Sequence, residues 1–122
     1  MRRLFVLTAA TALVAFAGTA NAHPKLLSAS PAPNATVATP AHVQLRFSEK
    51  LVSAFAKADL TMAAMRGMAA MKMPSTTLLS ADGHTVVITP KRKLAAGRYS
   101  VHWHVVSTDT HNATGDFAFA VK

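Results

Sequence analysis

Residues 99–105 constrain the fold more than any other stretch, because apolar and polar side chains alternate there without a break. In an extended chain, successive side chains point to opposite faces. One face would carry the apolar residues Tyr99, Val101, Trp103 and Val105. The other face would carry the polar residues Ser100, His102 and His104. This strict alternation predicts a half-buried β-strand rather than a helix.

Further short strands are predicted along the chain, each bounded by turn residues. Residues 42–47 alternate in the same way, with Val43, Leu45 and Phe47 on one face. Residues 85–89 form a β-branched run that Pro90 ends, and residues 116–121 form the last strand. About seven strands separated by proline and polar turns predict an all-β sandwich or Greek-key barrel.

The first 22 residues are typical of a secretory signal peptide. Met1, Arg2 and Arg3 precede an apolar run over residues 4–17, and small residues then end in Ala20-Asn21-Ala22. The apolar run is shorter than the roughly 20 residues that a spanning helix needs, and no second long run follows. We therefore expect a soluble exported protein whose single domain, residues 23–122, begins with His23.

Composition excludes several kinds of site. The chain has no cysteine, which excludes disulfides, blue-copper centres, iron–sulfur clusters and cysteine nucleophiles. Loss of Arg2 and Arg3 would leave 11 of the 13 basic residues against five acidic ones, a net charge of +6. These charges are scattered, and the one cluster, residues 91–93, is interpreted as a solvated turn. We expect neither nucleic-acid binding nor membrane embedding.

A histidine at a processed amino terminus can chelate a metal ion through its α-amine and its imidazole. Pro24 has no amide proton, so the backbone nitrogen that follows His23 cannot become a ligand. Asp109 and His111 supply a carboxylate and a second imidazole at same-face spacing. Nitrogen donors of this kind favour Cu(II), with zinc as the competitor. Asp109 could bind the ion directly or orient an imidazole.

Five of the six methionines lie between residues 62 and 73. As a helix this segment would spread its methionines over about half the circumference, with Gly67 in the middle and Pro74 at the end. We expect an exposed loop instead. Thioether sulfur is a soft donor that suits Cu(I), although methionine-rich surfaces also serve as adaptable binding patches.

Taken in order, these segments resemble the CopC family of periplasmic copper-binding resistance proteins. The resemblance rests on residues 23–26, residues 47–49, the methionine segment, and Ser107-x-Asp109-x-His111 followed by Gly115 and the last strand. It implies an immunoglobulin-like, cupredoxin-related β-sandwich with a Cu(II) site and, in some members, a separate Cu(I) site.

The resemblance also assigns residues to the two sites. By position it implies that Cu(II) is held by His23, Asp109 and His111, with Glu49 beside the ligands but not bound to the ion. Cu(I)-type members have sulfur ligands at the positions of Met62, Met65, Met68 and Met73. Those members carry a histidine where Ala70 stands here, and Met71 is the candidate replacement. His104 is a further residue that could approach the Cu(II) site.

Three functions compete. The favoured one is a copper carrier or buffer without catalysis, monomeric, that passes copper to an inner-membrane partner of the CopD kind or to another periplasmic copper protein. A copper monooxygenase would also use an amino-terminal histidine chelate, but the anionic Asp109 would occupy a position that oxygen needs. A metal-free immunoglobulin-like interaction module would leave the methionine segment unexplained.

Overall fold

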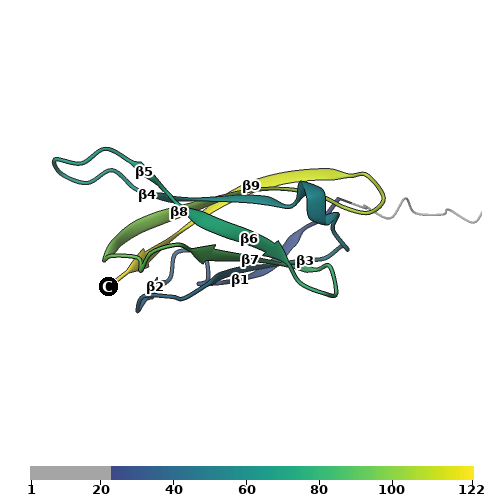
Figure 1. The fold of residues 1–122 in the computed structure, drawn as a ribbon, viewed down its shortest axis with the longest axis horizontal. Helices are drawn as coiled ribbons and strands as arrows, with labels where there is room; N and C mark the ends of the chain where they lie inside the picture. Colours follow the sequence, from purple (N-terminus) through teal and green to yellow (C-terminus); the bar gives the residue numbers. More distant parts are fainter. Residues whose placement is uncertain (1–22) are drawn as a thin grey trace, which may run out of the picture.

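The computed structural model describes residues 23–122, and these residues form two β-sheets packed face to face (Figure 1). The signal peptide expected over residues 1–22 lies outside the described residues. One sheet has four strands in the order β1 (Leu26–Ser30), β3 (Val43–Phe47), β7 (Thr85–Pro90) and β6 (Ser75–Leu79). The other has five strands in the order β2 (Thr36–Val37), β9 (Asn112–Val121), β8 (Gly97–Val106), β4 (Lys57–Met62) and β5 (Met71–Met73).

The expected all-β sandwich is confirmed, with nine strands in the described residues rather than about seven. The additional strands are short, since β2 has two residues and β5 has three. The only helical element within residues 23–122 is η1, a single 3-10 turn over Ser53–Phe55. No helix in this range is both long enough and apolar enough to cross a membrane.

The inward faces of the two sheets form one apolar core. On β3 and β8 the burial alternates residue by residue, as the sequence pattern predicts. The fully buried side chains include Val43, Leu45, Phe47, Leu60, Val86, Ile88, Val101 and Val105. Burial of each such side chain stabilises the fold by about 1.5–3 kcal/mol. Because the chain has no disulfide, this apolar core must hold the fold together.

Trp103 fills the core beneath β9 because Gly115 leaves room for it. The two residues are paired across β8 and β9, and a Cβ atom on Gly115 would lie 2.3 Å from Cζ2 of the indole. The indole also packs edge-on against Phe47, with ring centroids 5.0 Å apart. Gly115 is therefore required by the close approach of an aromatic ring.

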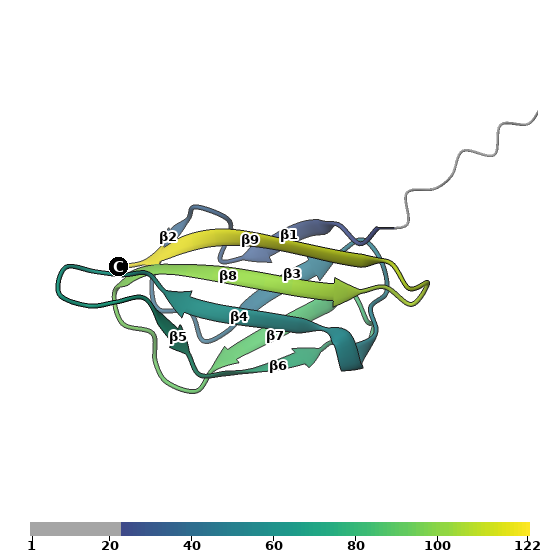
Figure 2. The same ribbon diagram turned by 90° about the horizontal axis from the view of Figure 1, so that it is seen from above.

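Strand β8 runs along most of the length of the sandwich and joins its two ends (Figure 2). At its first residues Tyr99 pairs with Met62 of β4, and at its last residue Val106 pairs with Asn112 of β9. Ten extended residues span about 30 Å. The methionine segment and the Asp109–His111 turn consequently lie at opposite ends of the molecule.

Candidate metal centres

His23 is held against one end of the sandwich by the two residues that follow it. Pro24 is buried, and the Lys25 backbone exchanges two hydrogen bonds with Ser48, one from Lys25 N to Ser48 Oγ and one from Ser48 N to Lys25 O, both 2.9 Å. The exposed His23 ring then lies beside His111, with ring centroids 5.0 Å apart and planes at 83°. The structure thus brings together two residues that are 88 positions apart in the sequence.

The turn between β8 and β9, residues 107–111, is closed by backbone hydrogen bonds. Ser107 N donates to His111 O and Thr110 N donates to Ser107 O, both at 2.9 Å. Thr108 N donates to Lys50 O at 2.9 Å, which ties the turn to the segment after β3. Thr110 has a φ of 73°, a left-handed conformation that is rare for a β-branched residue. Such a residue persists only where its surroundings fix it, so this turn is tightly specified.

Ser107 orients the carboxylate of Asp109. Ser107 is fully buried, and its hydroxyl donates a hydrogen bond to Asp109 Oδ1. That hydrogen bond is the main reason why the pKa of Asp109 lies below its ordinary value, and His111 lowers it further. The carboxylate therefore stays ionised and points toward the imidazole of His111.

His111 presents a ring nitrogen that adjoins Asp109 without a hydrogen bond to it. Its Nδ1 is 3.1 Å from Asp109 Oδ1, but this approach lacks the angle of a hydrogen bond. Nδ1 is buried and has no hydrogen-bond partner among residues 23–122. Buried polar atoms without partners are uncommon, and one that adjoins a carboxylate and a second imidazole fits the donor set of a transition metal.

His23, Asp109 and His111 are neighbours, yet their side chains have not converged around a point. In residues 23–122, no group of three or more His, Asp or Glu side chains is arranged to hold a metal ion. Ala22 precedes His23 in this chain, so the His23 nitrogen is an amide here and not the amine of the predicted chelate. Their role as ligands stays a prediction.

Glu49 and His104, the two other candidates near the Cu(II) site, lie in different places. Glu49 is half-buried between Ser48, which binds Lys25, and Lys50, which binds the 107–111 turn. It therefore lies at the same end as His23. His104 is on the outward face of β8, and its Nε2 is 3.2 Å from Asn112 Oδ1.

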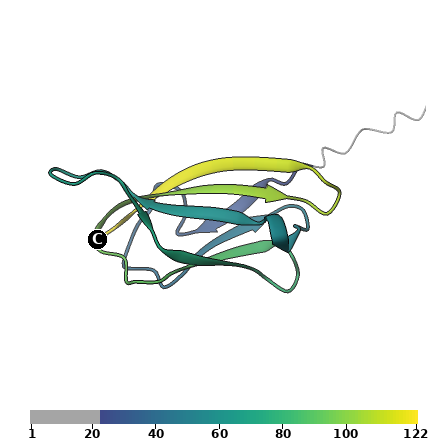
Figure 3. The same cartoon turned by 45° about the horizontal axis from the view of Figure 1, so that its top comes forward.

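The methionine segment is a β-hairpin, so the expected loop is corrected. Met62 of β4 pairs with Met71 of β5, and Met65 and Met68 exchange backbone hydrogen bonds of 2.9 and 2.8 Å around the tip. Gly67 supplies the left-handed residue of this turn, with a φ of 80°. The hairpin extends β4 and β5 beyond the body of the sandwich (Figure 3). Cross-strand pairing orders a segment that has no alternation in its sequence.

Exposure divides the five methionines into two groups. Met65, Met68 and Met71 are 45–49% exposed, whereas Met62 and Met73 are half-buried against the core. Met62 Cε and Met65 Sδ both lie within 4 Å of the position that a Cβ on Gly97 would take. A cavity of about 310 Å³ is lined by Met62, Met71 and Met73 together with Leu94 and Tyr99. The hairpin therefore gathers thioethers at its base and leaves others in solvent.

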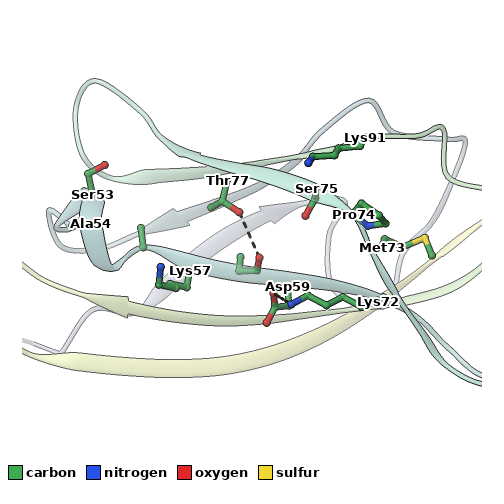
Figure 4. A pocket seen from close by; sticks show the side chains of 12 residues that line it. Ser53, Ala54, Lys57, Asp59, Lys72, Met73, Pro74, Ser75, Thr77 and Lys91 are labelled. Atoms are coloured by element: carbon green, nitrogen blue, oxygen red, sulfur yellow. Dashed lines mark hydrogen bonds and ion pairs between the residues drawn. The ribbon is translucent and has the colours of Figure 1, made fainter.

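A second cavity, of about 600 Å³, opens between β4 and β6 and adjoins the base of the hairpin through Lys72 and Met73 (Figure 4). Lys57, Lys72 and Lys91 line it, and Lys72 Nζ lies 3.0 Å from Asp59 Oδ1. Thr77 Oγ1 donates to Ala58 O at 3.5 Å across the opening. Met73 is the one residue among those lining this cavity that the sequence predicts to be a metal ligand.

Two residues that position these groups, Ser107 and Gly97, have no function that the sequence alone predicts. Ser107 stands within the Ser107-x-Asp109-x-His111 motif, and serine side chains often bond nearby backbone groups, as Ser107 Oγ does with the His111 backbone. Gly97 contacts Met62 only because β4 pairs with β8. No local sequence pattern predicts the contact between Gly97 and Met62.

Comparisons with known proteins agree with one another. The CopC domain model matches residues 26–122. Copper resistance protein C of Xanthomonas campestris pv. juglandis is 47% identical over 103 residues, covering 83% of this chain and 81% of the relative. Copper resistance protein C of Pseudomonas syringae pv. tomato is 48% identical over 105 residues, covering 84% and 83%. The crystal structure of PcoC, a methionine-rich copper resistance protein from Escherichia coli, superposes with a TM-score of 0.77 at 42% identity, covering 83% of this chain and all of that one.

Proposed function

The chain belongs to the CopC family, and from this membership we infer that it is a copper-binding protein of copper resistance that works in the periplasm. The observation that carries the proposal is the side-by-side placement of His23 and His111, beside the oriented carboxylate of Asp109. Two imidazoles and a carboxylate at the end of a cysteine-free sandwich are a donor set for Cu(II).

At the histidine end, defined as His23 with residues 107–111, we assign Cu(II) as the cargo. Cleavage before His23 would release an α-amine on the residue whose ring already faces His111. The ligands would then be that amine, the imidazoles of His23 and His111, and the carboxylate of Asp109. Glu49 would lie beside the ligands without binding the ion. Three nitrogens and one oxygen suit tetragonal Cu(II).

At the methionine end, defined as residues 62–73 of the β4–β5 hairpin, the cargo would be Cu(I). Met62, Met65, Met68, Met71 and Met73 supply only thioether donors, which are soft and bear no charge. Met62 and Met65 both reach Gly97, and Met71 lies opposite Met62, so up to three sulfurs can close on one ion at the base of the hairpin. Exposed Met68 would remain accessible to a partner.

The role that follows is a carrier or buffer rather than an enzyme. A leader over residues 1–22 would export the chain and produce the amino-terminal ligand in one cleavage. The monomer would pass copper to an inner-membrane transport partner of the CopD kind or to another periplasmic copper protein. Turnover is not expected, because anionic Asp109 fills a ligand position and stabilises Cu(II). Oxygen or peroxide consumption by the reduced copper protein, with many turnovers, would contradict this role.

The decisive experiment adds one alanine before His23 of the processed protein. Every side chain is kept, but the α-amine becomes an amide and the chelate ring is lost. Loss of a ligand should exceed the 10–100-fold cost of losing a partner of a ligand, so Cu(II) affinity should fall by more than about 100-fold. Paramagnetic resonance should lose a nitrogen coupling. An unchanged spectrum and affinity would show that the amino terminus is not a ligand, and His42→Ala is the matched control.

A further inference from the structure

The outward face of β8 carries two histidines that are not among the ligands proposed for either copper site. His102 and His104 are two residues apart on this strand, and both are exposed. On the neighbouring strands, Asp59 and Asp116 lie directly opposite His102. Lys57 and Thr114 lie opposite His104. The pairing therefore builds a row of polar side chains across three strands.

Hydrogen bonds leave one nitrogen of each imidazole free. Asp116 Oδ1 lies 2.7 Å from His102 Nδ1, and because the carboxylate can only accept, Nδ1 carries the proton. Nε2 of His102 then carries the lone pair, on a side chain that is 54% exposed. His104 donates from Nε2 to Asn112 Oδ1 at 3.2 Å, which leaves Nδ1 as its lone pair. Ligating histidines in proteins commonly have their second nitrogen bound in this way.

We propose that His102 and His104 form an additional, open binding site for a divalent transition-metal ion on the outer face of the five-stranded sheet. Residues i and i+2 of a strand are about 7 Å apart and point the same way, so both free nitrogens can reach one ion at the usual 2.0–2.1 Å. Water completes the coordination. The site has two protein ligands and is independent of the histidine end.

The surrounding charges define the class of ion. Lys72 lies 3.0 Å from Oδ1 of Asp59, and His102 lies 2.7 Å from Oδ1 of Asp116, so each carboxylate has one oxygen already engaged. Lys57 adds a positive charge beside His104. Calcium and magnesium, which need several oxygen ligands, are therefore disfavoured. Imidazole nitrogens select Cu(II) first, followed by Zn(II) and Ni(II).

The test uses the full protein with the histidine end disabled by His23→Ala and His111→Ala. Titration with Cu(II) or Zn(II), followed by calorimetry and by the imidazole resonances of His102 and His104, should show that this variant still binds one equivalent of metal ion. His102→Gln and His104→Gln should each abolish it, since a single imidazole no longer chelates. The matched control is His42→Gln, another exposed histidine with one hydrogen bond, to Thr89.

Asp116→Asn tests whether the imidazole of His102 binds the ion or only lies near it. It removes the carboxylate that fixes the tautomer of His102, so affinity should fall about 10–100-fold while the equivalent is retained. Because these side chains point outward, circular dichroism and thermal unfolding should match the parent. The proposal is overturned if the parent shows no remaining equivalent, or if that equivalent survives the combined His102→Gln and His104→Gln change.

Discussion

The two ends of this sandwich hold their proposed metal ligands in opposite ways. At the histidine end, a buried serine, a turn closed by backbone hydrogen bonds and a tethered amino-terminal segment hold the donors on the body of the protein. At the methionine end, the thioethers sit on a hairpin that extends past the body, and three of its five methionines are exposed. A fixed geometry suits the directional ligand field of Cu(II), and an adaptable one suits Cu(I).

Replacing thioether sulfur should have the largest effect, and it should be confined to one end. Exchange of Met62, Met65, Met68 and Met73 for leucine should abolish Cu(I) binding and leave Cu(II) binding nearly unchanged. Stability should change by less than about 1.5 kcal/mol, because hydrophobic volume is roughly kept. Competition titrations with a Cu(I) chelator measure the loss. Retained Cu(I) affinity would reduce the hairpin to an apolar patch.

Removing the hydroxyl of Ser107 should produce the reverse pattern. Ser107→Ala takes away the donor that orients Asp109. Cu(II) affinity should fall about 10–100-fold, the usual cost of losing a partner of a ligand, and Cu(I) affinity should not change. Thr108→Ala, an exposed residue of the same turn, is the control. Equal losses in the two variants would mean that the turn as a whole, and not this hydroxyl, sets the affinity.

Acid should also distinguish the ends. Imidazole and amine nitrogens must be deprotonated to bind, so Cu(II) affinity should fall by more than about tenfold between pH 7 and 5. Asp109 does not contribute to this loss, because Ser107 and His111 hold its pKa below the ordinary value and it stays ionised. Thioethers do not titrate, so Cu(I) affinity should stay level. A parallel fall at both ends, measured at fixed ionic strength, would contradict the assignment.

The smallest effect concerns the two turns, each of which needs one left-handed residue. The methionine end uses Gly67, and the histidine end uses Thr110. Gly67→Ala should weaken the hairpin by about 1–2 kcal/mol through its backbone alone, since a Cβ there would contact nothing within 4 Å. Thr110→Gly should change unfolding by less than about 1 kcal/mol, because relieved strain offsets the greater entropy of unfolded glycine. Hydrogen exchange at each turn measures both.

The sequence predicted the strands whose two faces differ. Alternation located β3 and β8 almost to the residue, because each has one buried and one exposed face. It did not reveal β5, which has three residues and lies on an exposed hairpin. Local pattern also cannot give register, and register is what brings Met62 to Gly97 and Trp103 over Gly115.

The candidate sites divide in the same way. Donor chemistry singled out His23, Asp109, His111 and the methionines without knowledge of distance. Their separation to opposite ends was not foreseen, because it follows from the antiparallel course of β4, β8 and β9. The role of Ser107 depends on its complete burial, which a polar residue in a turn does not suggest.

The length of β8 also limits electron exchange between copper ions bound at the two proposed sites. Electron tunnelling through protein decays exponentially with distance, and the ten residues of β8 hold the ends about 30 Å apart. Two copper ions bound at the two ends would therefore not exchange electrons with each other. The protein could carry oxidised and reduced copper at once, and a reductant acting at one end would leave the valence of the other unchanged.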